Sequence, residues 1–218
     1  MLLTNELLTI GFTLVSNFVR IVDLPSEMAP VAANDVRTFV VGYIYAPTDV
    51  YLALNNGYEF WIRRGIVQRF SSPGSSVRDG SISLPIHPET PTLGSNGVME
   101  LATRLVSQLG KRWNPIVDVV PISEAASRSD GSPPTSYEVY WPTTNAQAPF
   151  RYAALVKIDP RGGVLTFMDL RDEGFYDYNF AQEISNRVYA ADPSAKPKPR
   201  PPPPRPTAKQ VEVGIASW

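Results

Sequence analysis

The stretch AALVKIDPRGGVLTFMDL, residues 153–170, decides the fold class, because it holds two runs of apolar and β-branched residues around a turn sequence. The runs Phe150–Ile158 and Val164–Leu170 have the composition of β-strands. Between them, residues 159–163 read DPRGG, and aspartate, proline and glycine are residues that tight turns need. The stretch therefore predicts a β-hairpin with two antiparallel strands.

An amphipathic helix and two further strands are predicted ahead of this hairpin. The helix, at 98–109, has apolar residues at the spacing of one helix face, and Gly110 closes it. These apolar residues are Val98, Leu101, Ala102, Leu105 and Leu109. The strands are expected at 116–122 and 137–142. We therefore predict the α+β class, with a module over 98–191 in which an antiparallel sheet of about four strands in 114–171 packs on one long helix.

The order of helix, strand, strand and hairpin over 96–170 resembles that of PepSY-type and cystatin-like modules, in which an antiparallel sheet wraps one long helix. A run that is common in that superfamily is matched here by Val156, Ile158, Asp159, Gly163, Val164 and Leu165. The sequences GYEFW at 57–61 and IVQRF at 66–70 are similar to the leading part of uncharacterised bacterial proteins that carry such a module. The resemblance brings no catalytic residues, and it implies an association with peptidase propeptides or the cell envelope.

Residues 1–25 predict an amphipathic N-terminal helix. Apolar residues at helical spacing form one stripe, and Pro25 would end the helix. The stripe consists of Leu8, Phe12, Val15, Val19 and Val22. We expect the stripe to face the core, with a membrane-surface or partner-docking helix as the alternative. No transmembrane span is expected, because Arg20 and Asp23 interrupt the apolar run, and no basic region or cleavage site indicates a signal peptide.

Residues 36–71 predict a small strand-helix-hairpin unit. The strand is expected at 36–46, where β-branched and aromatic residues dominate. A short helix is expected at about 49–54, since Thr48 or Asp49 can cap its start and an Asn-Asn-Gly turn follows it. The period-two pattern of 58–70 then predicts a hairpin that turns at Arg63-Arg64-Gly65.

A short internal similarity links the two predicted units. The sequence GYEFW at 57–61 is similar to SYEVYW at 136–141, and each follows a predicted helix. A duplication within the chain is one interpretation of this similarity.

Two other regions differ in composition from the predicted units. Residues 72–97 are rich in serine, glycine and proline and are interpreted as a loop or linker. Residues 193–210 form a proline-rich tail, with eight prolines and four cations in 193–206, which predicts an extended polyproline II chain outside the core. The tail is interpreted as a spacer or a solubilising end, with docking to an aromatic groove as the alternative. Residues 211–218 are apolar again, and VEVGI alternates as an added edge strand would.

The composition excludes several function classes. The 218 residues include no cysteine and one histidine, His87, so disulfides, cysteine nucleophiles and two-histidine metal sites are ruled out. His87 lies between prolines in a loop and lacks the partners that catalysis needs. Five of the 20 basic residues and one of the 21 acidic residues follow position 192, which leaves 1–192 with a net charge of −5. That charge argues against a nucleic-acid partner.

Four acidic residues lie close together after the last predicted strand, at Asp169, Asp172, Glu173 and Asp177. Clustered carboxylates suit hard cations such as calcium. Their spacing does not match an EF-hand loop, however, and acidic residues are favoured ahead of a helix, which is predicted at about 177–191. We therefore expect no metal site and no cofactor.

The candidate binding site is the hairpin of 58–70, which combines aromatic rings with cations. Its candidate residues are Phe60, Trp61, Arg63, Arg64, Arg69 and Phe70. We expect a non-catalytic binding or structural module that engages a protein or peptide partner through a sheet edge or this hairpin surface. The resemblance adds that the partner is a peptidase or an envelope protein.

Two other function classes stay open at this stage. A carboxylate-dependent, glycosidase-like hydrolase is one, because two carboxylates that are distant in sequence can meet in space about 5–10 Å apart. An RNA-contacting protein that uses Trp61 and the arginines of 63–69 is the other, because aromatic rings and cations together stack bases and hold phosphates.

Overall fold

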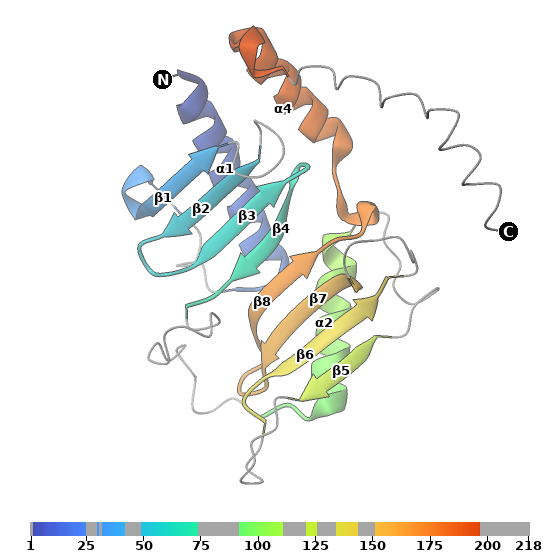
Figure 1. Ribbon diagram of the computed structural model, residues 1–218. Helices are drawn as coiled ribbons and strands as arrows, with labels where there is room; N and C mark the ends of the chain where they lie inside the picture. Colours follow the sequence, from blue (N-terminus) through green and yellow to red (C-terminus); the bar gives the residue numbers. More distant parts are fainter. Residues whose placement is uncertain are drawn as a thin grey trace, which may run out of the picture.

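The structure, a computed structural model, has an α+β fold built around one eight-stranded antiparallel sheet (Figure 1). The predicted class and the antiparallel sheet are confirmed. The residues that the structure describes are 2–24, 30, 32–41, 49–73, 92–110, 121–125, 134–143 and 151–196. Within these residues, the α-helices are α1 (Leu2–Ile21), α2 (Ser95–Leu109) and α4 (Tyr178–Ala191).

The sheet has the strand order β1-β2-β3-β4-β8-β7-β6-β5, and every neighbouring pair is antiparallel. Its first four strands are β1 (Val36–Val41), β2 (Val50–Leu54), β3 (Glu59–Arg63) and β4 (Ile66–Ser71). The other four are β5 (Ile122–Ala125), β6 (Tyr137–Pro142), β7 (Tyr152–Asp159) and β8 (Val164–Leu170). In the described residues, α1 is thus followed by the four antiparallel strands of one half of the sheet and α2 by the four of the other half.

The two halves meet where β4 pairs with β8, a contact that we call the seam. Three residue pairs form it: Arg69 with Asp169, Phe70 with Met168, and Ser71 with Phe167. The units predicted at 36–71 and 98–191 therefore share one sheet. They are not separate sheets on either side of a linker.

The same irregularity recurs in the hairpin next to the seam in each half. In β3–β4, Trp61 pairs with Arg69 but Ile62 pairs with Val67, which leaves Gln68 as an extra residue. In β7–β8, Lys157 pairs with Phe167 but Ile158 pairs with Leu165, which leaves Thr166 as an extra residue in the same way. Together with the repeated element order, the matching bulges show a repeated topology. The similarity of 57–61 to 136–141 does not follow this repeat, because it aligns the third strand of one half with the second strand of the other.

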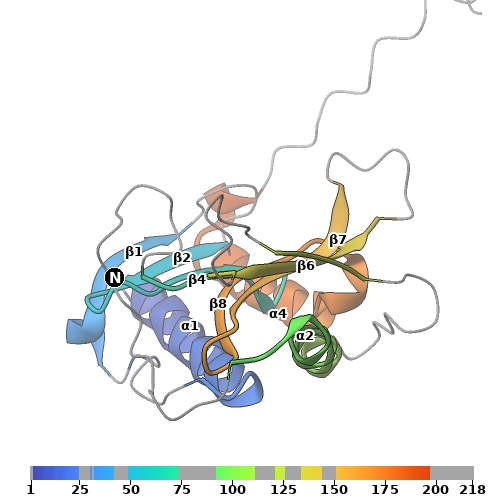
Figure 2. The same cartoon turned by 90° about the horizontal axis from the view of Figure 1, so that it is seen from below.

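The core lies between the sheet and the helices α1 and α2, which cover the same face of the sheet (Figure 2). Val15 and Val19 of α1 and Val22 directly after it are buried there, so the predicted core-facing stripe is confirmed for these residues. The helix α2 buries Val98, Ala102, Leu105 and Val106, in agreement with the predicted amphipathic helix. No described helix is long and apolar enough to cross a membrane.

The short helix predicted at 49–54 is wrong, because this segment forms β2. Val50 and Tyr51 are strand-forming residues, and β2 pairs with both β1 and β3, which satisfies its backbone. A six-residue helix has no comparable source of stability. The turn after it, which ends at Gly57 with φ of 89°, closes a hairpin, although such a glycine would equally end a helix.

Several predictions fall wholly or partly outside the described residues. They concern 42–46 of the first strand, most of the 72–97 linker with His87, 116–120 of a later strand, and 197–218 of the tail. Of the strand predicted at 116–122, Ile122 opens β5. At the start of the proline-rich region, Pro193–Ala195 forms a single 3-10 turn.

Candidate functional site

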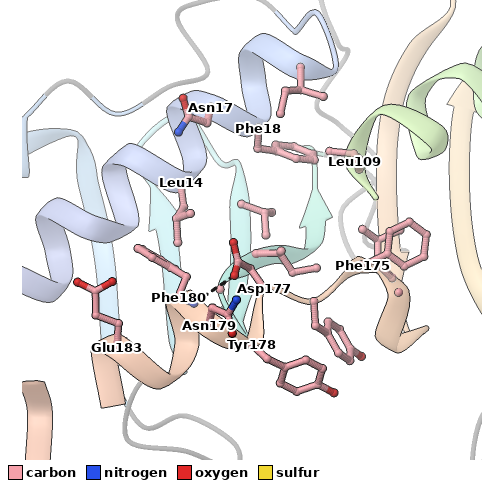
Figure 3. A pocket seen from close by; sticks show the side chains of 17 residues that line it. Leu14, Asn17, Phe18, Leu109, Phe175, Asp177, Tyr178, Asn179, Phe180 and Glu183 are labelled. Atoms are coloured by element: carbon pink, nitrogen blue, oxygen red, sulfur yellow. Dashed lines mark hydrogen bonds between the residues drawn. The ribbon is translucent and has the colours of Figure 1, made fainter. Parts of the chain in front are cut away.

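A cleft of about 690 Å³ opens between α1, the β3–β4 turn, the C-terminal end of α2 and the first turn of α4 (Figure 3). The 3-10 turn η3 (Glu173–Phe175) closes one side of it. Its apolar walls include Leu14, Phe18, Ile21, Phe175 and Phe180. Segments from both halves of the chain, and from the helix that follows them, therefore contribute to one concave site.

The helix α1 supplies one wall through residues that lie on one helix face. Leu14, Phe18 and Ile21 are spaced by four and three residues, so their side chains follow one another along the cleft. Phe18 is buried, and its ring lies 5.5 Å from that of Phe70 in the core. Ile21 is 39% exposed at the end of the helix. The wall thus runs from a fixed aromatic ring to an open apolar rim.

The β3–β4 turn forms the floor of the cleft and requires a glycine. Arg64 and Gly65 have φ of 51° and 80°, so this two-residue turn is of the I′ type that joins twisted antiparallel strands. A Cβ atom on Gly65 would lie 2.6 Å from the backbone oxygen of Asp177. The backbone N–H of Asp177 in turn donates to the carbonyl oxygen of Arg64, at 3.0 Å. The absence of a side chain at 65 therefore lets the start of α4 approach the hairpin.

The first turn of α4 is fixed by Asp177, whose carboxylate accepts a hydrogen bond of 3.1 Å from the backbone N–H of Phe180 (Figure 3). This is an N-cap, and it confirms the helix predicted at about 177–191. The cap sets the direction of Phe180, which lines the cleft, and of Tyr178, which is 47% exposed at its rim.

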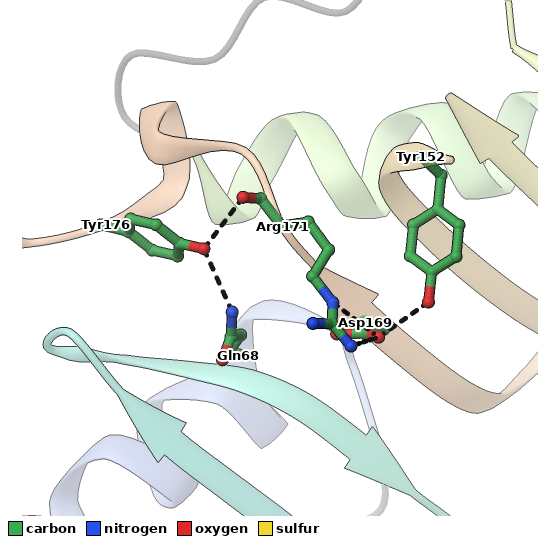
Figure 4. Close-up of polar contacts among 5 residues, drawn as sticks. All are labelled: Gln68, Tyr152, Asp169, Arg171 and Tyr176. Carbon is green, nitrogen blue, oxygen red and sulfur yellow. Dashed lines mark hydrogen bonds and ion pairs between the residues drawn. The ribbon is translucent and has the colours of Figure 1, made fainter. Parts of the chain in front are cut away.

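The cation of the turn lies over the aromatic rings of this wall. The guanidinium carbon of Arg64 is 4.7 Å from the ring centre of Tyr176 and 6.0 Å from that of Tyr178. The Tyr176 hydroxyl accepts a hydrogen bond of 3.1 Å from Gln68 and donates one of 2.9 Å to the carbonyl oxygen of Arg171 (Figure 4). Burial raises the pKa of Tyr176. The phenol is therefore a neutral structural link between the two halves.

A second polar cluster lies beside the seam, around Asp169 (Figure 4). This carboxylate is 2% exposed and accepts hydrogen bonds from the Tyr152 hydroxyl at 2.8 Å and from Arg171 at 3.0 and 2.7 Å. Burial, followed by the charge of Asp169, raises the pKa of Tyr152 to about 12. The buried charge is thus compensated by a cation and a phenol, as buried charges must be.

The four clustered acidic residues serve the local fold in three cases. Asp169 belongs to the buried cluster just described, Asp172 accepts a hydrogen bond of 2.7 Å from the N–H of Gly174, and Asp177 caps α4. Over the described part of the chain, no group of three acidic or histidine side chains is arranged to hold a metal ion.

Phe60 and Phe70, two of the predicted site residues, lie on the helix-covered face of the sheet. Both are fully buried, and their rings are 5.4 Å apart and contact Phe18. They belong to the core, so this structure does not present them to a partner. Both were predicted as binding residues, because sequence alone does not show that α1 covers their face of the sheet.

Trp61 and Arg69 lie on the opposite face of the sheet, where they form part of a stack. The guanidinium carbon of Arg69 lies 4.7 Å from the ring of Trp61 and 5.0 Å from that of Phe167 across the seam. The ring of Tyr51 lies 5.1 Å from that of Trp61. These half-buried side chains therefore contact one another along the sheet surface, away from the cleft.

Arg63 and Arg64 have different surroundings. Arg63 forms an ion pair of 3.4 Å with the buried Asp49. Arg64 packs on Tyr176 and Tyr178, which line the cleft. Of the two turn arginines, Arg64 is thus the one that packs on the aromatic residues of the cleft wall.

Sequence reasoning missed the residues of the cleft wall itself. The run Phe175-Tyr176-Asp177-Tyr178-Asn179-Phe180 contains four aromatic residues in six positions. That density ahead of a polar helix was the available signal, since a solvated loop seldom carries so many rings. The contribution of α1 could not be found in this way, because Leu14, Phe18 and Ile21 lie beside the predicted apolar stripe of the same helix and show no separate pattern.

Exposed large apolar side chains gather at this cleft. Four are found among the described residues, and two of them, Ile21 and Tyr178, line it. The other two, Val40 at 37% and Ile122 at 42% exposed, lie on β1 and β5 at opposite ends of the sheet. The cleft is therefore where exposed apolar surface and a concave shape coincide.

Comparisons with protein-family models, curated proteins and solved structures gave no match. The chemistry of the cleft itself is then the basis for a function. Its described lining includes two carboxylates, Asp177 and Glu183, of which one caps a helix and the other pairs with Arg187 at 2.6 Å. The amides of Asn17 and Asn179 lie among the apolar residues. This arrangement suits recognition of an apolar group with a few hydrogen bonds at its edge.

Proposed function

We propose that the protein is a binding module that holds an apolar segment of a protein or peptide partner in the cleft, without catalysing a reaction. The observation that carries this proposal is the position of Ile21 and Tyr178, two exposed apolar side chains on the rim of one apolar cleft. Exposed apolar surface of this kind is typical of interaction sites, and the volume of about 690 Å³ lies in the range of binding sites.

The polar side chains of the cleft favour a peptide as the occupant. Asn17 and Asn179 each carry an amide that donates and accepts hydrogen bonds, as a peptide backbone requires. They come from α1 and from the first turn of α4, with apolar residues between them (Figure 3). An apolar side chain of the partner would enter the cleft while its backbone contacts these amides.

The expected affinity for a peptide partner comes mainly from a few buried side chains. Full burial of an aliphatic or aromatic side chain is worth about 1.5–3 kcal/mol. Burial of Ile21, Tyr178 and one partner side chain therefore supplies much of the binding free energy of a weak to moderate complex, from which the ordering of the partner is subtracted.

The type of partner is proposed from the resemblance to PepSY-type and cystatin-like modules. A helix followed by four antiparallel strands, as in α2 with β5–β8, supports this resemblance. We propose a peptidase or an envelope protein as the partner, which the module would inhibit or assist in folding.

Peptide selection tests the proposal directly. Peptides would be selected from a random library on the purified chain, and their affinities measured for the unmodified protein, Ile21→Asp and the control Val40→Asp. The two positions are almost equally exposed, at 39% and 37%, but only Ile21 lines the cleft. We expect apolar peptides that lose at least about tenfold in affinity with Ile21→Asp, since a buried charge without a partner is costly, and little with Val40→Asp.

Three results would overturn the proposal. They are a failure to select peptides, an equal loss of affinity in both variants, and turnover of a glycan or peptide panel by the purified chain. A capture experiment with and without nuclease separates the RNA alternative, because an RNA-contacting protein would lose its partner after nuclease treatment.

A further inference from the structure

The charge of Arg64 has no counter-ion among the residues that the structure describes. Its neighbour Arg63 forms an ion pair of 3.4 Å with Asp49. The guanidinium of Arg64 contacts two rings of the cleft wall instead, with its carbon 4.7 Å from the ring centre of Tyr176 and 6.0 Å from that of Tyr178. Aromatic rings hold a cation through their electron-rich faces and leave its charge in place. A half-buried cation therefore lies beside the cleft, and its charge is available to a partner.

The two described carboxylates that line the cleft have other partners. Asp177 accepts the N-cap hydrogen bond from the backbone N–H of Phe180, and the positive end of the helix dipole stabilises its charge. Glu183 pairs with Arg187 at 2.6 Å. Both acidic groups are thus compensated within α4, whereas Arg64 is not compensated by a described residue.

The backbone of Arg64 holds this cation next to the cleft. Its φ of 51° lies in the left-handed region, which the first position of a type I′ turn usually fills with asparagine, aspartate or glycine. Arg64 also lines a small pocket of about 20 Å³ together with Leu14 and Gly65, both of which line the cleft as well. An arginine in a conformation that suits smaller residues better is typical of a functional position.

A carboxylate is the partner group that fits this arrangement. A guanidinium that is stacked on rings has a fixed direction, and its edge donates two parallel hydrogen bonds to a carboxylate. A phosphate group carries up to two negative charges and is usually bound by several arginines. One arginine without a counter-ion among the described residues matches the single charge of a carboxylate better.

We infer that Arg64 selects partners in which a carboxylate lies next to the apolar group that enters the cleft. This inference rests on the proposed function, because it names the chemistry of the same partner segment. The carboxylate belongs to an acidic side chain beside the apolar residue, or to the C-terminus of a partner that ends in that residue. It binds the edge of the guanidinium while the apolar group packs beside Tyr178.

A thermodynamic cycle between Arg64 and the peptide carboxylate tests the inference. An apolar peptide selected on the purified chain is synthesised with glutamate or glutamine beside its apolar residue, each with a free or an amidated C-terminus. Calorimetry measures its affinity for the unmodified protein and for Arg64→Gln. We expect removal of the recognised carboxylate to weaken binding to the unmodified protein by about five- to tenfold, and to Arg64→Gln by less than about twofold. The glutamine and amide forms show which of the two carboxylates is recognised.

Arg69→Gln is the matched control, and Arg64→Asn is a second test variant. Arg69 is also half-buried, and its guanidinium carbon also lies 4.7 Å from a ring, that of Trp61, but on the face of the sheet away from the cleft. Its replacement changes the net charge equally and should preserve the preference for the carboxylate. Arg64→Asn should abolish the preference while the turn stays intact, because asparagine suits this turn position.

Three results would overturn the inference. They are an equal affinity of all four peptides for the unmodified protein, an unchanged preference in both Arg64 variants, and a loss in these variants that is the same for every peptide. The last result would mean that the stack of Arg64 on the tyrosines only supports the fold. In all three cases the peptides still bind, so the proposed function stands, whereas a failure to select any peptide overturns both.

Discussion

Single residues fix the shape of the cleft. Gly65 allows the start of α4 to approach the hairpin, while Tyr176 and Asp177 fix the approaching segment. The contacts of Asp177 with Arg64 and Gly65, and the hydrogen bond from Gln68 to Tyr176, connect residues that are far apart in the chain. A change at one position should therefore affect both stability and the shape of the cleft.

Gly65→Ala should destabilise the protein and displace α4. The new Cβ would lie 2.6 Å from the Asp177 carbonyl oxygen at a residue with φ of 80°. We expect a loss of at least about 1 kcal/mol in the free energy of unfolding and weaker peptide binding. Urea denaturation measures the first effect. Gly11→Ala is the control, because it lies within α1 and a Cβ there would meet only the Ile62 side chain at the ordinary distance of 3.6 Å; a comparable loss in this control would contradict the steric explanation.

Tyr152 should make stability depend on alkaline pH. Its pKa is raised from 10 to about 12 in the folded protein, so the folded state favours the protonated phenol. The stabilisation is complete below pH 10 and is lost as the pH rises towards 12. Tyr152 is only partly buried, so we expect about 1–2 kcal/mol, less than the unscreened shift would give. Unfolding curves of the protein and Tyr152→Phe across this pH range should converge at the alkaline end, and parallel curves would contradict the assignment.

At the scale of elements, the first turn of α4 connects the fold to the proposed function. Its cap orients Tyr178 and Phe180, and the adjacent run of aromatic residues forms the cleft wall. The rest of α4 has a separate task, since Ile184 and Val188 pack on α1 and beside β1. The first turn of α4 therefore lines the cleft, and its later turns pack beside the edge of the sheet.

Asp177→Ala should cost about 1 kcal/mol in unfolding free energy, the usual effect of losing an N-cap. It should also weaken peptide binding, because Tyr178 and Phe180 lose their fixed direction. Asp192→Ala is the matched control, since Asp192 caps the 3-10 turn Pro193–Ala195 and does not line the cleft. If both variants bound the selected peptides equally well, the cap would have no role in the cleft.

The elements that could be predicted from sequence are those set by local patterns. The hairpins at 58–70 and 153–170, the helix α2 and the helix α4 follow from turn residues and apolar spacing. The strand β2 was missed because the glycine after it suits a hairpin turn and a helix end equally. The cleft could not be predicted from sequence, because Ile21 and Tyr178 come together only when α1 and α4 pack on one sheet.

At the scale of the whole molecule, the seam makes two similar halves into one structure. Three residue pairs join β4 to β8, and the buried core continues from Phe60 and Phe70 in one half to Val156 and Met168 in the other. A core that is shared in this way should couple the halves when they unfold. The pairing itself was not predictable, because no local pattern indicates which strand lies beside β4.

We expect the protein to unfold in one cooperative transition, and Phe70→Ala to lower the midpoint of both halves together. A fully buried phenylalanine usually contributes about 3–5 kcal/mol. Calorimetry would show one peak, and hydrogen exchange would report the same loss of protection in β2 and β6. Two separate peaks, or a loss confined to β2, would show that the halves unfold independently.

The seam also has a consequence for the order of folding events. Arg69 and Asp169 are neighbours in space but 100 positions apart in the chain, whereas the strands within each half pair with their sequence neighbours. Contacts between distant positions carry the larger loop-closure entropy, so they form late in folding. We expect Met168→Ala to speed unfolding and to leave the folding rate nearly unchanged, as stopped-flow measurements across denaturant concentrations would show. The barrier to folding would then be crossed while the two halves are still separate, and the pairing of β4 with β8 would form last.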